Sequence, residues 1–121
     1  MGARINYVFK DSDAHPAVVL YSHWGETEWQ RDLAMALEHS KPRWSDDTYA
    51  TRMMISYLIQ DSVLEETGFG IYAVDPKDLM LGDFTVIVDL LHKTVYEEGS
   101  DTKVNWASFI AAYAPSLVEQ V

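Results

Sequence analysis

The sequence lacks cysteine altogether, which excludes disulfide bonds and thiolate metal ligands. It is also poor in positive charge, because nine lysines and arginines stand against nineteen aspartates and glutamates and the formal net charge is −10. An acidic chain repels the phosphates of nucleic acids and anionic lipids. We therefore expect no nucleic-acid partner. The charge indicates either plain solubility or attraction to a protein partner with a basic surface.

Long apolar runs are absent as well, since none approaches the roughly 18 residues that a membrane span needs. We therefore expect no membrane partner. The first residues alternate apolar and polar positions instead of forming the apolar segment of a signal peptide. With the absence of cysteine, this predicts a cytoplasmic protein. The 121 residues, 48% of them apolar, predict one packed domain over residues 1–121.

Five segments have the composition and alternation of strands. Residues 3–10 and 17–22 flank a turn-rich segment and predict a hairpin. Residues 69–74 predict a third strand. Residues 84–90 and 93–97 predict a second hairpin, with the first of its strands inside the sheet.

Three segments repeat apolar residues with the period of a helix. The first begins near Thr27, where the spacing to Gln30 is that of a capping box. The second begins at Ser45, extends as far as Leu64 and has the wider apolar face, so we expect it to be the more buried of the two. The third is short and ends before Pro115.

The resulting order, ββ-αα-βββ-α, predicts an α+β fold. We expect a mostly antiparallel sheet of about five strands with the helices packed on one face. The same periodicities predict a core of large apolar side chains: Trp29, Leu33, Leu37, Tyr57, Phe84, Val86, Val88, Trp106, Phe109 and Ile110.

No catalytic or cofactor motif is present. The four histidines show no metal-ligand spacing, so we expect no metal site. The one Gly-x-Gly, residues 68–70, follows a helix and enters a strand, which is the reverse of a dinucleotide-binding turn. We therefore expect no cofactor.

The strand-to-helix corner at residues 21–25 is the best candidate for a binding site. Such a corner presents side chains at a sheet edge and leaves backbone N–H groups free at the helix start. Here it gathers Tyr21, His23 and Trp24 beside Gly25. Trp24 is either a plug of the core or an exposed anchor for a partner protein.

Arg52 is a further binding candidate, because it is one of few cations in a long acidic region. It follows Asp47 by five residues and Asp46 by six, so that a pair could form across a helical turn. A local ion pair with one of them is the interpretation we favour, and an anionic ligand in a cleft is the alternative.

The opening Met1-Gly2-Ala3-Arg4 and the corner resemble a small family of proteins found in phages and bacteria. In that family a strand hairpin precedes a Tyr-x-x-(Trp/Tyr)-x-Gly segment and a helix, and Tyr21 and Trp24 stand at matching positions. Gly25 directly follows Trp24 and so departs from the family's glycine spacing. The family has no settled activity. The resemblance implies a phage or mobile-element origin, and with it the cytoplasm of a host cell, but no site residues.

We interpret the chain as a small acidic interaction protein that binds and modulates a basic host protein. The net charge, the missing catalytic motifs and the aromatic corner lead to this interpretation. The alternative is a small enzyme or small-molecule-binding protein with a cleft near residues 21–25. In an enzyme, His23 and a carboxylate such as Asp89 would act as an acid–base pair.

Overall fold

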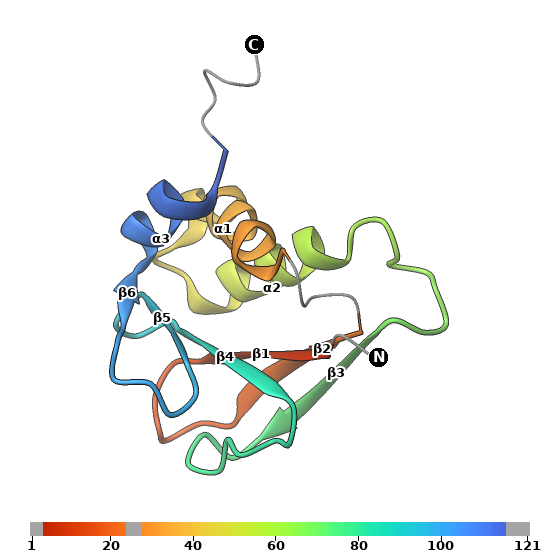
Figure 1. Ribbon diagram of the computed structural model, residues 1–121, viewed down its shortest axis with the longest axis horizontal. Coiled ribbons are helices and arrows are strands. Elements are labelled where there is room, and N and C mark those ends of the chain that lie inside the picture. Colours follow the sequence, from red (N-terminus) through yellow and green to blue (C-terminus); the bar gives the residue numbers. More distant parts are fainter. Residues whose placement is uncertain (1–3, 24–27, 116–121) are drawn as a thin grey trace.

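The computed structural model describes residues 4–23 and 28–115, which fold into an α+β arrangement (Figure 1). In chain order the described elements are β1 (Ile5–Lys10), β2 (Ala17–Ser22), α1 (Trp29–His39), a 3₁₀ turn η1 (Lys41–Arg43), α2 (Asp47–Ile59), β3 (Phe69–Val74), β4 (Phe84–Asp89), β5 (Thr94–Glu97), β6 (Val104–Asn105) and α3 (Trp106–Tyr113). The predicted fold class and element order are confirmed.

The described strands form one sheet in the order β3-β2-β1-β4-β5-β6. Every neighbouring pair is antiparallel except β1 and β4, which are parallel. The sheet is therefore mixed and has six strands, where about five were expected. β6 is only two residues long, too short for an alternating pattern to reveal it.

The strand directions determine which residues meet at each end of the sheet. Ile5 pairs with Ser22 on one side and with Phe84 on the other. Lys10, at the other end of β1, pairs with Asp89. The end of β2 thus lies beside the starts of β1 and β4.

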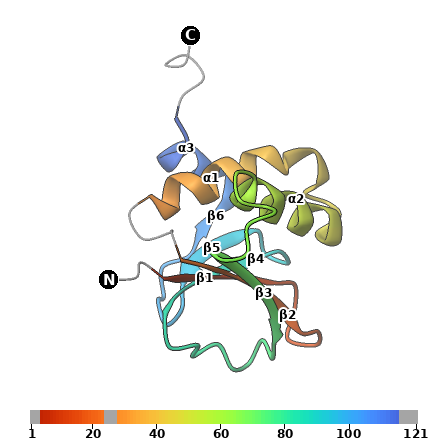
Figure 2. The same ribbon diagram turned by 90° about the vertical axis from the view of Figure 1, so that its right-hand side faces the viewer.

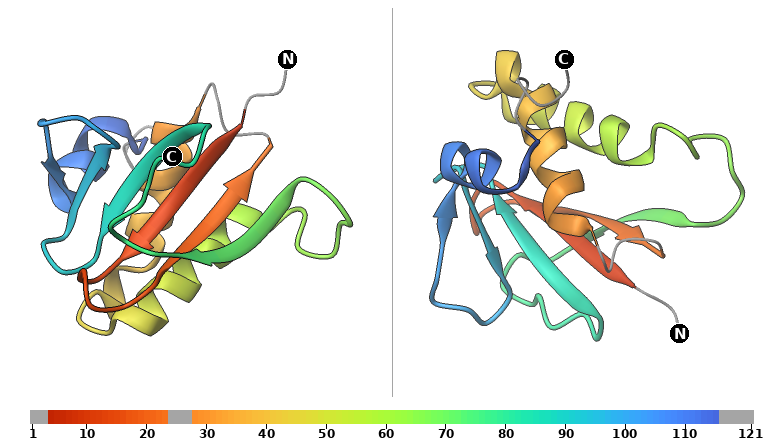
Figure 3. Two further views of the ribbon diagram at one scale, coloured as in Figure 1. Left: turned by 90° about the horizontal axis from the view of Figure 1, so that it is seen from below. Right: turned by 45° about the horizontal axis from the view of Figure 1, so that its top comes forward.

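The three α-helices cover one face of the sheet (Figure 2). Alternate residues of β1, namely Ile5, Tyr7 and Phe9, point toward them and join the main core cluster. The opposite face carries a smaller cluster around Val8, which the loop of residues 75–83 covers with Leu79 and Leu81. Figure 3 (left) shows this loop crossing the outer face between β3 and β4.

Most of the predicted core is confirmed. The buried members are Trp29, Leu33, Leu37, Val86, Val88, Trp106 and Phe109. Tyr57 and Ile110 are only half-buried. Phe84 was predicted wrongly, because its side chain is 39% exposed. It begins β4 at the end of the sheet, where one side of its ring meets solvent.

The expectation that α2 is the more buried helix is wrong. Buried residues of α2 are Ala50 and Met54, whereas α1 buries five residues. The apolar flanks of α2 line two pockets instead of closing against the sheet. The cap of the helix is Asp46, one residue later than the expected Ser45, and it accepts a hydrogen bond from the backbone N–H of Tyr49 at 3.3 Å.

None of the helices in the described part of the chain combines the length and apolar character needed to cross a membrane.

Candidate functional site

Tyr21 and His23 lie together at the end of β2. The Tyr21 hydroxyl is 3.3 Å from Nδ1 of His23, and the two ring centroids are 6.0 Å apart. Both side chains are half-buried. They share the face of the sheet opposite the helices, because Ser22 between them points to the helix side. Trp24, the third predicted member of the corner, lies outside the described residues.

The expected acid–base pair of His23 and Asp89 does not form. β4 runs antiparallel to β2, so the two residues lie at opposite ends of the sheet, separated by the length of β1, about 17 Å. The Asp89 carboxylate instead holds the following turn. It accepts a hydrogen bond from the backbone N–H of His92 at 2.9 Å, and its other oxygen lies 3.0 Å from Nδ1 of His92.

Arg52 does not form the expected ion pair with Asp46 or Asp47. Its Nη1 donates a hydrogen bond to the Ser56 hydroxyl at 3.2 Å, while the Asp46 carboxylate caps α2. Arg52 lines a pocket of about 430 Å³ between α2 and the β1–β2 hairpin, which has Phe9 in its wall. This pocket lies at the far end of the sheet from Tyr21 and His23, so Arg52 does not share a site with those two residues.

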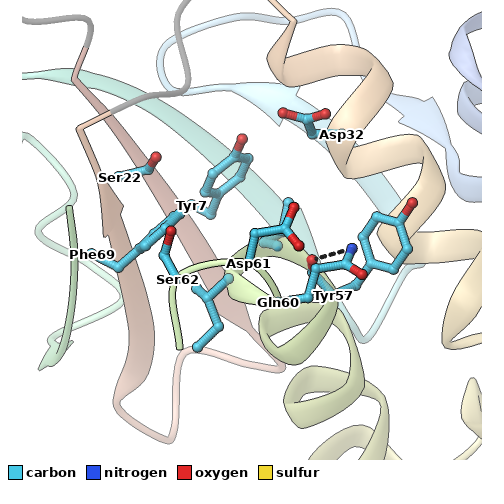
Figure 4. Close-up of a pocket in the computed structure, with 10 residues that line it drawn as sticks. Tyr7, Ser22, Asp32, Tyr57, Gln60, Asp61, Ser62 and Phe69 are labelled. Atoms are coloured by element: carbon cyan, nitrogen blue, oxygen red, sulfur yellow. Dashed lines mark hydrogen bonds between the residues drawn. The ribbon is translucent and has the colours of Figure 1, made fainter. Parts of the chain in front are cut away.

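A second pocket lies on the helix side of the corner (Figure 4). It has a volume of about 280 Å³ and is lined by β1, α1, the end of α2 with the residues after it, the end of β2 and the start of β3. We call it the acidic pocket and define it by its polar lining: Tyr7, Ser22, Asp32, Gln60, Asp61 and Ser62. Apolar and aromatic side chains, including Phe69, complete the wall.

Tyr7 forms the floor of the acidic pocket. Its side chain is only 2% exposed and rises from the middle of the central strand β1. Within residues 4–23 and 28–115 its hydroxyl makes no hydrogen bond. Burial, and secondarily the charge of Asp32, raise the pKa of the Tyr7 hydroxyl above its usual value. Tyr7 therefore stays neutral and offers both a proton and a lone pair to the pocket.

Asp32 and Asp61 supply the charge of the acidic pocket. Asp32 projects from α1, and Asp61 follows the end of α2 (Figure 4). Burial and repulsion from Glu28 raise the pKa of the Asp32 carboxyl, against the opposing effect of Arg31. No lysine, arginine or histidine is among the described lining residues. The pocket therefore concentrates negative charge without a built-in counter-ion.

The lining offers the carboxylates of Asp32 and Asp61 as hydrogen-bond acceptors, together with hydroxyl groups such as that of Tyr7. These groups can bind a hydrogen-bond donor. The residues that the structure describes contain no group of three carboxylates or histidines placed to hold a metal ion.

Sequence reasoning missed all three acidic-pocket residues Tyr7, Asp32 and Asp61. Tyr7 was read as one of the apolar residues of its strand, between Ile5 and Phe9. The available signal was the hydroxyl group of Tyr7, which is a polar group on a strand face whose other side chains, Ile5 and Phe9, are wholly apolar. For Asp61 no local signal exists, because its place beside β1 depends on how α2 packs.

The lysines and arginines of the described chain seldom neutralise its carboxylates. Lys10 and Arg31 form ion pairs, with Asp13 at 3.3 Å and Glu28 at 3.2 Å. Four other cations lie over aromatic rings at 4.6–6.0 Å from the ring centroid: Lys41 on Trp44, Arg43 on Tyr49, Lys93 on Trp106 and Lys103 on Tyr96. Most surface carboxylates are thus left without a cationic partner.

Comparison of the chain with protein-family models, curated proteins and solved structures finds no match.

Proposed function

We propose that this is a small acidic interaction protein, phage-encoded, that binds and modulates a basic protein in the cytoplasm of its host. The observation that carries the proposal is the placement of its cations. Because four of them lie over aromatic rings, most surface carboxylates of the described chain have no cationic partner, and in a chain of net charge −10 these unpaired carboxylates produce a negative field. Such a field attracts a basic surface and repels nucleic acid.

Charge alone does not hold a complex together. At physiological salt the Debye length is about 8 Å, so the field accelerates encounter more than it prolongs binding. The lifetime requires an anchor that loses its water on binding. From the sequence, Trp24 is the candidate anchor, and the neighbouring pair of Tyr21 and His23 offers an aromatic and polar surface beside it.

A small-molecule-binding protein or small enzyme with a cleft near residues 21–25 is the second candidate. The acidic pocket supports the binding form of this alternative, because Ser22 in its wall adjoins the corner. Asp89, the carboxylate named as an example partner of His23, lies at the other end of the sheet, so an enzymatic form would need a different carboxylate beside His23.

Affinity capture with the tagged full-length chain from a bacterial host lysate, treated with nuclease, tests the proposal. The retained proteins are identified, and the most enriched one is purified and bound directly. We expect a protein with a basic surface whose retention survives nuclease. Retention of nucleic acid, or direct binding only to a protein with an acidic surface, would overturn the proposal. Release of a small molecule from the purified chain, without a protein partner, would favour the second candidate.

A further inference from the structure

We infer that the acidic pocket is a binding site for a guanidinium or ammonium group. The inference rests on the proposed function for the source of that group, an arginine or lysine side chain of the basic partner. The site itself is defined by three groups that reach one space from separate elements: Tyr7 from β1, Asp32 from α1 and Asp61 from the turn after α2 (Figure 4).

The Tyr7 hydroxyl is the observation that points to a ligand. A buried polar group in a folded protein is nearly always hydrogen-bonded. Tyr7 as a whole is only 2% exposed and lines the pocket, and its hydroxyl makes no hydrogen bond in the part of the chain that the structure describes. The hydroxyl is not sealed in the core, because the described side-chain atom that is fully buried without a partner is Thr94 Oγ1, so the Tyr7 hydroxyl is open to the pocket. A bound donor would satisfy its lone pair, and the aromatic ring fixes the hydroxyl in place before the ligand arrives.

The charge of the pocket selects the class of ligand. The carboxylates of Asp32 and Asp61 can each accept hydrogen bonds, and the described lining holds no lysine, arginine or histidine to pair with them. An anion would therefore be repelled, whereas a cationic donor would gain charge-assisted hydrogen bonds. A guanidinium suits this site best, because its planar fork of donors can reach both carboxylates and the tyrosine at once.

Size and wall composition agree with an organic cation. A volume of about 280 Å³ is at the lower end for ligand pockets, and it suits a side-chain head group with its stem. Phe69 and Tyr57 in the wall offer ring surface for the cation or for its methylene stem. A metal ion fits less well, since the described residues gather no set of three ligands.

The test is a titration of the full chain, followed by amide NMR shifts, with n-butylguanidinium and with its neutral isostere n-butylurea. We expect butylguanidinium to shift resonances around Tyr7, Ser22 and Asp61, and butylurea to cause no saturable shift. Equal binding of the two probes, or shifts located elsewhere, would overturn the inference.

Variants connect the binding to the named groups. Asp32→Asn and Asp61→Asn should each weaken butylguanidinium binding by about tenfold, and Tyr7→Phe by less, because it removes a neutral partner. Asp78→Asn is the matched control. It removes the same charge from an exposed residue of the loop opposite the helices and should leave binding unchanged. If Asp78→Asn weakens binding as much as Asp32→Asn, the attraction is to the whole surface and the pocket is not the site.

A third probe separates the source of the cation from the site. A blocked Gly-Arg-Gly peptide should bind as well as butylguanidinium if the natural ligand is a side chain of a partner protein. If butylguanidinium binds and the peptide does not, the site stands but takes a free small cation, and the proposed function loses its support from the pocket. If neither binds, the site inference fails while the surface-charge proposal still depends on its own capture experiment.

Discussion

Trp29, in the first turn of α1, packs edge-on against Phe84 at the start of β4, with the ring centroids 5.5 Å apart. Trp29 also stacks on Phe109 of α3 at 6.1 Å. These contacts fix the beginning of α1 against the sheet and against the last helix. Because Asp32 lies one turn after Trp29, the same contacts set the position of its carboxylate at the acidic pocket.

The packing of α1 in the core predicts that shortening one of its buried side chains causes a large loss of stability. Leu33→Ala should lower the free energy of unfolding by about 2–5 kcal/mol, because the leucine is fully buried against the sheet. Phe84→Ala is the comparison and should cost about 1–2 kcal/mol, since one side of its ring already meets solvent. Urea unfolding measures both. A loss below half a kcal/mol for Leu33→Ala would remove that residue from the core.

The raised pKa of Asp32 predicts how stability depends on pH. The folded chain holds this proton more tightly than the unfolded chain, so stability falls as the pH rises from the ordinary pKa of aspartate, about 3.9, through the raised folded value. Asp32→Asn should therefore stabilise the protein at pH 7. We expect a gain below about 1 kcal/mol, because the carboxylate is partly solvated.

The gain from Asp32→Asn should shrink as the pH falls toward 4, where wild-type Asp32 becomes protonated in both states. Asp78→Asn, measured beside it by urea unfolding, accounts for the general benefit of removing one negative charge from an acidic chain. If Asp32→Asn proves destabilising at pH 7, the carboxylate has a structural partner and is not held ready for a ligand.

The corner predicts the kinetics of partner release. Trp24→Ala should raise the dissociation rate of the complex about tenfold or more, as expected for a central aromatic anchor. Tyr49→Ala is the control. It removes an exposed aromatic ring from the first turn of α2 and should change the dissociation rate little. Surface plasmon resonance with the purified partner gives both rates. A loss of several kcal/mol in unfolding free energy for Trp24→Ala, with no change in dissociation, would make Trp24 a core plug instead.

Local patterns were sufficient to predict the α-helices and the strands other than the two-residue β6, but not all of the strand pairings. The alternation of Ile5, Tyr7 and Phe9 identified β1, and the turn-rich residues 11–16 identified its hairpin with β2. The parallel pairing of β1 with β4 joins strands more than seventy residues apart. No pattern within either strand indicates this pairing, because it depends on how the helices pack against the whole sheet.

The candidate site shows the same limit more strongly. Tyr21 and His23 were grouped at the corner because they are close in the sequence, and the Tyr21 hydroxyl does lie 3.3 Å from Nδ1 of His23. Arg52 was expected to pair with Asp46 or Asp47 across a turn, but separations of six and five residues do not place side chains together on a helix, and Asp46 is used as the helix cap. The acidic pocket exists only where three elements meet, so no single stretch of sequence contains it.

The salt dependence of association with the captured partner tests the central claim most directly. The account predicts that raising salt from 50 to 300 mM lowers the association rate on the order of tenfold and changes the dissociation rate far less, because the field of unpaired carboxylates acts on encounter. An association rate that does not change with salt would contradict it.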